Sequence, residues 1–145
     1  MIKIICVGKI KEKYLSDLIN DYKTRISKYH KIEIIELKDS DKQKESREIL
    51  ESVKQNEFNI LLDINGDEFT SLDFSKYIFD IFGKSNGTIT FIIGGSDGVD
   101  DSVRNVVQKR ISFSRLTFPH GLFRGILLEQ IYRSFKIQNN ESYHK

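Results

Sequence analysis

Residues 88–98 read T-I-T-F-I-I-G-G-S-D-G, a run of β-branched and aromatic residues that ends directly in two glycines. Such a run predicts a buried strand, and ligands of α/β proteins gather at the carboxyl ends of strands. Consecutive glycines there let a ligand approach the backbone closely. The segment matches neither G-x-G-x-x-G nor a phosphate-binding P-loop. Taken alone, it predicts a tight turn as readily as a binding site.

On both sides of this segment, short apolar runs alternate with stretches of helical spacing. The predicted strands cover residues 3–8, 32–37, 58–64, 88–93 and 111–116. The predicted helices cover residues 12–29, a segment around 49–53, and residues 71–82, 99–109 and 120–138. Asn65-Gly66 is a strong turn signal after the third strand, and Ser71 is the expected N-cap of the following helix. Strands separated by helices predict an α/β fold, a parallel sheet covered on both faces, in one domain over residues 1–145.

The composition limits the class of protein. Hydrophobic residues make up 39% and charged residues 30% of the chain, an ordinary balance for a globular domain. No apolar run approaches the roughly 20 residues of a membrane span, and the N-terminus lacks a secretory signal, so we expect a cytoplasmic protein without a membrane partner. The single cysteine, Cys6, lies in an apolar run and is expected to be a buried core thiol. Three histidines lie far apart in sequence, and we expect no metal site.

Charge is distributed unevenly along the chain. Residues 104–145 hold eight Lys or Arg and two acidic residues, whereas the first 103 residues hold 15 basic and 19 acidic ones. A basic C-terminal third suggests a polyanionic partner. A solvated basic surface explains the charge equally well, so charge alone does not decide.

The last predicted helix is apolar almost all round. Its apolar residues are Leu122, Phe123, Ile126, Leu127, Leu128, Ile131, Tyr132, Phe135 and Ile137. A helix that is apolar on every side must be buried on every side. We therefore expect a second subunit to cover one side, giving a homodimer; the alternative is a central helix buried within one chain.

Several segments taken together are more specific than any one of them. They are I-G-G-S-D-G at 93–98, S-F-S-R-L-T-F-P-H at 112–120, L-L-E-Q-I-Y-R-S-F-K-I at 127–137 and the terminal E-S-Y-H-K. With the N-terminal M-I-K-I-I-C-V-G-K-I-K-E-K-Y, they make the chain resemble the ribosomal RNA large subunit methyltransferase H family of the SPOUT superfamily. The resemblance covers essentially the whole chain and is densest after residue 94.

This resemblance implies a fold and an activity. The fold is the SPOUT α/β knot, in which the C-terminal part forms a deep trefoil knot, an exception to the rule against threaded chains. The activity is methylation of N3 of pseudouridine at position 1915 of 23S rRNA, with S-adenosyl-L-methionine (SAM) as methyl donor. Family members act as homodimers, and we expect the assembled ribosome to be the substrate.

The resemblance also implies a cofactor site on three loops. Its residues are Leu62, Gly94, Phe113, Ser114, Arg115, Leu116, Thr117 and Phe118. An adenine requires an apolar slot, which Leu62, Leu116 and Phe118 are suited to form. In an unrelated protein, each of these three would be an ordinary core residue.

Candidates for the chemistry lie on the last helix and the tail. Methyl transfer requires alignment of donor and acceptor, and N3 of pseudouridine must lose a proton. The catalytic candidates are His144, Tyr143, Arg124 and Arg133. The alternative for both arginines is a surface ion pair with Glu129, and for His144 a solvated chain end.

The other two histidines are not candidates for the chemistry, and two other functions fit the sequence. His120 is expected at a helix start, and His30 on the solvated surface. The first rival function is a SPOUT methyltransferase acting on another RNA, such as tRNA. The second is a ribosome-associated RNA-binding protein without catalysis, which would have no reason to keep all three loops.

Overall fold

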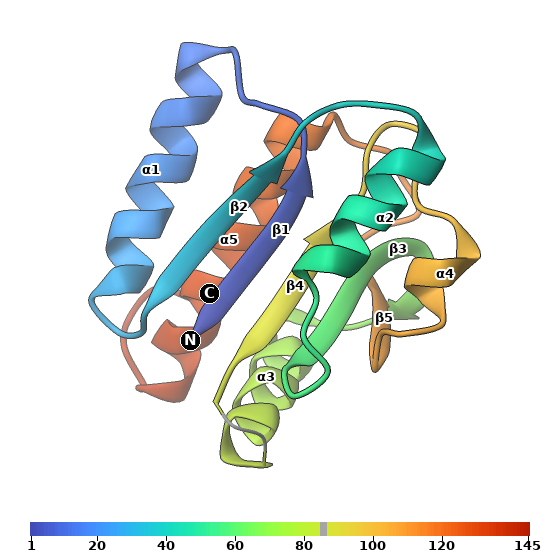
Figure 1. Ribbon diagram of the computed structural model, residues 1–145. Helices are drawn as coiled ribbons and strands as arrows, with labels where there is room; N and C mark the ends of the chain where they lie inside the picture. Colours follow the sequence, from blue (N-terminus) through green and yellow to red (C-terminus); the bar gives the residue numbers. More distant parts are fainter. Residues whose placement is uncertain (85–86) are drawn as a thin grey trace.

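Five parallel strands form one sheet in the computed structural model, which describes residues 1–84 and 87–145 (Figure 1). The strands are β1 (Ile2–Val7), β2 (Ile32–Leu37), β3 (Phe58–Glu68), β4 (Ile89–Ile93) and β5 (Lys109–Ser112), in the order β2-β1-β4-β3-β5. In the centre, Ile4 pairs with Ile34 on one side and with Phe91 on the other. Every residue of β1 and β4 is buried, as expected of a parallel sheet with both faces covered.

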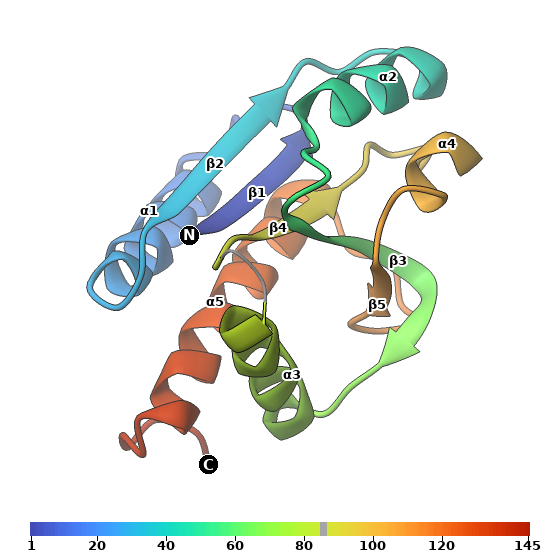
Figure 2. The same cartoon turned by 60° about the horizontal axis from the view of Figure 1, so that its bottom comes forward.

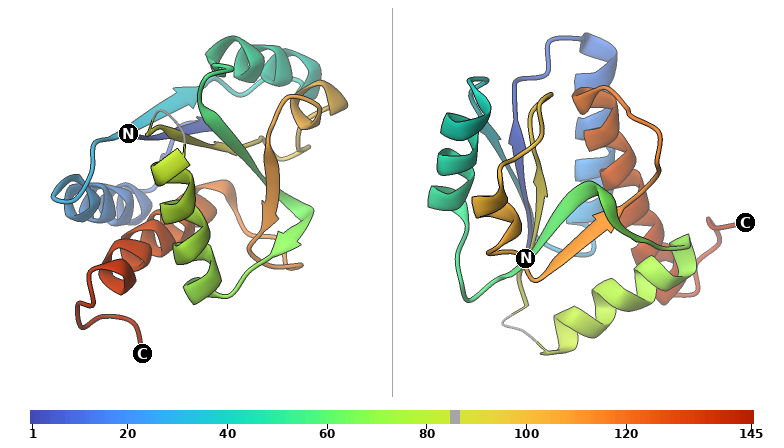
Figure 3. Two further views of the ribbon diagram at one scale, coloured as in Figure 1. Left: turned by 90° about the horizontal axis from the view of Figure 1, so that it is seen from below. Right: turned by 90° about the vertical axis from the view of Figure 1, so that its right-hand side faces the viewer.

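Helices cover both faces of the sheet, as the sequence predicts (Figures 2 and 3). One face carries α1 (Lys13–Ser27), α3 (Ser71–Lys84) and α5 (His120–Gln138); the other carries α2 (Lys42–Ser52) and the short α4 (Asp101–Arg104). Alternation along β1 divides the core, with Ile4 facing the first group and Ile5 the second. In the part of the chain that the structure describes, no helix has the length and apolarity needed to cross a membrane.

Helix α5 lies between α1 and α3 and runs antiparallel to the strands (Figure 1). Leu127, Leu128 and Ile131 are fully buried there, whereas Leu122 near the start of the helix is 37% exposed. Helices of the same chain therefore provide much of the burial that the sequence argument assigned to a second subunit. The apolar surface of α5 does not by itself require a dimer, and the homodimer stays a prediction.

The predicted turn at Asn65-Gly66 is wrong. Strand β3 continues through both residues to Glu68, with a shift in its register to β5 between Leu62 and Asp67. Gly66 passes so close to β5 that an added Cβ would lie 2.6 Å from the carbonyl carbon of Arg110. The glycine thus permits two backbones to approach within a strand, which local sequence cannot distinguish from a turn.

Three further boundaries differ from the prediction. Helix α4 has four residues instead of the span 99–109, and β5 covers 109–112 instead of 111–116 because residues 113–118 leave the sheet. Ser71 is the first residue of α3, and the hydroxyl of Thr70 accepts the amide of Asp73 at 3.1 Å, so Thr70 is the cap. The depth to which the C-terminal segment is threaded stays a prediction.

Candidate functional site

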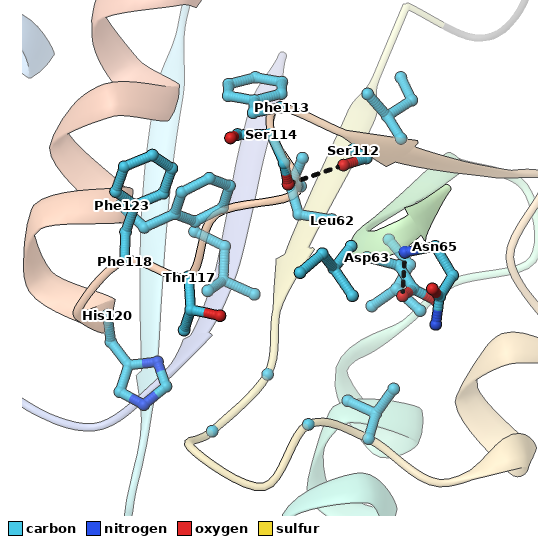
Figure 4. Close-up of a pocket in the computed structure, with 18 of the residues that line it drawn as sticks. Leu62, Asp63, Asn65, Ser112, Phe113, Ser114, Thr117, Phe118, His120 and Phe123 are labelled. Atoms are coloured by element: carbon cyan, nitrogen blue, oxygen red, sulfur yellow. Dashed lines mark hydrogen bonds between the residues drawn. The ribbon is translucent and has the colours of Figure 1, made fainter. Parts of the chain in front are cut away.

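A pocket of about 310 Å³ opens beside the middle of β3 and the carboxyl end of β4 (Figure 4). Three segments line most of it: residues 61–65 of β3, most of residues 93–99 at the end of β4 and beyond it, and much of the stretch from 111 to 123, which begins in β5; Arg104 of α4 also lines the pocket. Its volume lies at the lower end of the roughly 300–1,000 Å³ of small-molecule sites. The location is the ligand-binding edge of an open parallel sheet.

The pocket brings together nearly all of the residues that the resemblance assigns to the cofactor. The predicted residues that line it are Leu62, Gly94, Phe113, Ser114, Leu116, Thr117 and Phe118. Arg115 lies on the same loop but is exposed and is not among the lining residues. Residues separated by up to 56 positions in sequence thus meet at one concave surface.

Side chains of α2 contact the glycine loop, residues 94–98, and the segment that follows it. A Cβ on Gly94 would lie 2.8 Å from Cγ1 of Val99, and one on Gly95 would collide with the carboxylate of Glu45. That buried carboxylate also accepts the amide of Ser40 at 2.8 Å, and the buried hydroxyl of Ser46 accepts the amide of Asp100 at 3.0 Å. Sequence reasoning missed this support, because α2 lies far from the loop along the chain.

Aromatic rings form one wall of the pocket. Phe118 stacks on Phe123 with centroids 6.2 Å apart, and Phe113 meets Phe123 edge-on at 5.6 Å. The hydroxyl of Ser114 accepts the amide of Leu116 at 3.0 Å and so fixes the loop. Leu116 is 72% exposed at the rim of the pocket.

The opposite wall is polar, and sequence reasoning missed it too. Asp63 directly follows Leu62, and its side chain is only 8% exposed. Its Oδ2 lies 3.5 Å from Nε of Arg104 and 3.6 Å from a guanidinium nitrogen of Arg110. The pocket thus combines an aromatic wall, a glycine loop and a buried carboxylate. This combination fits a ligand that contains a nucleoside, and SAM contains an adenosine.

Arg124, predicted as a catalytic candidate, lies outside this pocket. Its side chain is 1% exposed and pairs with Glu36 at 2.6 Å, not with Glu129. It also donates to the carbonyl of Gly8 at 3.1 Å. With its guanidinium held by a carboxylate and a backbone carbonyl, Arg124 joins α5 to the ends of β1 and β2, and nothing in this geometry favours a catalytic role.

The other three catalytic candidates form one cluster at the end of α5. Arg133 pairs with Glu129 at 3.0 Å, as the alternative interpretation predicted, and contacts Nδ1 of His144 at 3.0 Å. The hydroxyl of Tyr143 donates to Glu129 at 3.1 Å. Burial, the hydroxyl of Tyr22 and the carboxylate of Glu129 raise the pKa of Tyr143, so the phenol stays neutral near pH 7. The tail is thus tied to α5.

This cluster is far from the pocket of its own chain. His120, which lines the pocket, begins α5 as predicted, and Arg133 follows 13 residues later. At about 1.5 Å per residue, the helix separates the two by roughly 20 Å. The tail therefore lies toward the opposite end of the sheet (Figure 2).

The remaining sequence predictions concern isolated side chains. Cys6 is fully buried, as predicted, and burial raises its pKa to about 11. The prediction that His30 is solvated is wrong: its ring packs on Phe82 at 4.7 Å, and burial lowers its pKa. Among the described residues, no group of three or more His, Cys, Asp or Glu is placed to hold a metal ion.

Comparisons with known proteins place the chain in a family. A family model described as "Predicted SPOUT methyltransferase" matches residues 1–144. Proteins named ribosomal RNA large subunit methyltransferase H from Clostridium acetobutylicum and Fusobacterium nucleatum are 44% and 48% identical, and each match covers 99% of both chains.

Solved structures share the fold at much lower identity. A probable methylase family protein from Haemophilus influenzae aligns with a TM-score of 0.57 at 11% identity, covering 96% of this chain and 66% of that one. The SpoU methyltransferase AviRb from Streptomyces viridochromogenes aligns with a TM-score of 0.51 at 10% identity, covering 98% and 62%. At these identities the likeness concerns the fold alone.

Proposed function

The chain belongs to the SPOUT methyltransferase family, and from this premise we propose that it methylates N3 of a pseudouridine in 23S rRNA of the large ribosomal subunit, with SAM as methyl donor. The observation that carries the proposal is the meeting of three segments, from the middle of β3 and from the stretches that follow β4 and β5, in one pocket. Relatives that are 44–48% identical over nearly their whole length bear names of large-subunit rRNA methyltransferases. The site and the family thus support the same chemistry.

The pocket residues suit the cofactor by their chemistry. Phe118 and Leu116 offer apolar contacts to an adenine, while the glycine loop leaves the backbone open to a close approach. Bound SAM supplies an electrophilic methyl group for in-line displacement. The protein's task is then to align the acceptor nitrogen and to assist removal of its proton. Arg115 is exposed on the same loop, and an arginine there suits a contact with an RNA phosphate.

The active form is proposed to be a homodimer in which the tail of one subunit reaches the pocket of the other. Support comes from the roughly 20 Å between the pocket and Arg133 within one chain. His144, Tyr143 and Arg133 could then act on the substrate, with His144 as the candidate base. His144→Ala should lower turnover and leave the dissociation constant for SAM unchanged; unchanged turnover would remove His144 from the mechanism.

Mixed dimers test whether the tail acts across the interface. One chain would carry His144→Ala and the other Gly94→Leu, which adds a side chain to the glycine loop near Val99. If the tail acts in the neighbouring subunit, mixing these two impaired proteins gives more activity than either has alone, because one composite site is intact. If it acts in its own chain, no mixture exceeds the activity of the His144→Ala protein.

Calorimetry of SAM binding to the purified protein tests the cofactor. We expect one SAM per pocket, with binding abolished by Gly94→Leu. Gly83→Ala is the matched control, because a Cβ there meets nothing within 4 Å. Failure of the unaltered protein to bind SAM would overturn the enzymatic assignment and favour the non-catalytic RNA-binding protein.

Methyl transfer to different RNAs tests the substrate. Ribosomes, isolated large subunits, free 23S rRNA and tRNA would be compared with labelled SAM, followed by mapping of the modified nucleotide. A chain of 145 residues has little surface for RNA, so we expect activity on the assembled particle, in the cytoplasm where ribosomes reside. Activity on tRNA alone would favour the rival SPOUT function.

A further inference from the structure

One polar atom in the pocket wall has no hydrogen-bond partner among the described residues. It is Oδ2 of Asp63, on a side chain that is only 8% exposed. Buried polar atoms are almost always hydrogen-bonded in folded proteins, so an exception inside a ligand pocket indicates a missing donor. Figure 4 shows Asp63 next to Asn65 in the wall formed by β3, across the pocket from Phe118.

The neighbours of Asp63 fix the carboxylate but leave this buried oxygen without a hydrogen bond. Oδ1 accepts the amide of Asn65 at 3.0 Å, which sets the orientation of the group. Arg104 and Arg110 approach Oδ2 only to 3.5 and 3.6 Å, too long for well-formed hydrogen bonds. They balance the charge of the carboxylate without saturating its lone pairs.

The chemistry of the site favours a neutral donor over a cation. Two guanidinium groups already offset the charge of Asp63, so an ammonium or sulfonium would gain little from it and would face both arginines. Hydroxyl groups carry no such penalty and form strong hydrogen bonds with a carboxylate. An adenosyl group whose base lies toward Phe118, on the other wall, carries two such hydroxyls on its ribose.

We propose that Asp63 accepts a hydrogen bond from the ribose hydroxyls of the bound adenosyl cofactor and thereby selects a ribonucleoside in this pocket. This inference rests on the proposed function, because it takes the cofactor to be SAM. It adds a specificity-determining side chain next to Leu62. Asp63 acts on binding, not on methyl transfer itself.

Calorimetry with S-adenosylhomocysteine and its 2′-deoxy and 3′-deoxy analogues tests this role. We expect Asp63→Asn to weaken binding of S-adenosylhomocysteine by roughly 10- to 100-fold, the usual effect of one hydrogen bond to a charged group. The analogue that lacks the contacted hydroxyl should bind the unaltered protein weakly. Its affinity for the Asp63→Asn protein should be only slightly lower than for the unaltered protein. Asp67→Asn is the matched control, since Asp67 lies on the same strand, is exposed and pairs with Lys109 outside the pocket.

The outcomes separate this proposal from the broader one. An equal loss for all three ligands would assign Asp63 a purely structural role and overturn the inference. Equal affinity of the unaltered protein for all three ligands would overturn it as well. This comparison does not depend on whether a variant folds. No binding of S-adenosylhomocysteine or SAM by the unaltered protein would instead refute the proposed function itself.

Discussion

Replacing Gly66 by alanine should destabilise the protein, and the same change at Gly83 should not. In β3, a Cβ on Gly66 would lie 2.6 Å from the carbonyl carbon and 2.7 Å from the carbonyl oxygen of Arg110. Real Cβ atoms do not approach backbone so closely, and the obstacle is a paired strand, not the end of a flexible side chain. β3 and β5 must therefore separate locally to admit the methyl group.

The expected cost follows from overpacking of a tight contact. Extra methyl groups in well-packed sites typically cost about 1–3 kcal/mol, and a clash with backbone places Gly66→Ala at the upper end, near 3 kcal/mol. For a domain of 145 residues, this corresponds to a decrease in Tm of roughly 10 °C. Because β5 leads directly into the loop at residues 113–118, the variant should also bind SAM more weakly.

Thermal and urea unfolding followed by circular dichroism would measure this cost. The control is Gly83→Ala in α3, where an added Cβ meets nothing within 4 Å and alanine is the better helix former. Because Gly83 is the penultimate residue of the helix, that variant should gain less than the roughly 1 kcal/mol of a helix interior. If Gly66→Ala unfolds at the same midpoint as the unaltered protein, β3 and β5 do not approach as closely as the structure shows. That result would favour the turn that the sequence predicts at Asn65-Gly66.

Three further predictions concern buried polar groups. Glu36→Gln should lower the free energy of unfolding by about 3 kcal/mol, because it leaves the guanidinium of Arg124, which is 1% exposed, without its counter-charge. Arg124→Met should cost less, because the carboxylate that it leaves on Glu36 is 38% exposed and can be hydrated; equal losses in urea unfolding would contradict this. Ser46→Ala should cost about 1 kcal/mol by removing the acceptor of a loop amide and should weaken SAM binding in calorimetry; unchanged affinity would separate α2 from the site. Burial raises the pKa of Glu57, but hydrogen bonding and ion pairing with Lys3 outweigh it, so the pKa is lowered on folding. The stabilisation by ionised Glu57 is complete above the pKa of about 4.3 that a glutamate has in the unfolded chain, and it is lost as the pH falls through the lower pKa of the folded state. The free energy of unfolding of Glu57→Gln should therefore decrease less on acidification than that of the unaltered protein. The same pH dependence in both proteins would refute this prediction.

Sequence patterns alone determined the alternating architecture and the position of the pocket loops. Apolar runs such as Ile2–Val7 and Ile89–Ile93 predict buried strands because both faces of a parallel sheet are covered. The resemblance to a family assigned Leu62, Gly94 and Phe118 to one cofactor site, and the structure brings these three residues together. Each of these inferences depends on residues close together in sequence or on a whole motif.

Only the tertiary structure decided which partners the side chains meet. The apolar residues of α5 predict that the helix is buried. They do not show that α1 and α3 of the same chain bury it. Arg124 pairs with Glu36, 88 residues away, and the carboxylate of Glu45 lies beneath Gly95, because folding places distant segments side by side. Gly66 is the plainest case: a glycine suits a turn and a close approach of two strands equally well, and only the neighbouring strand distinguishes them.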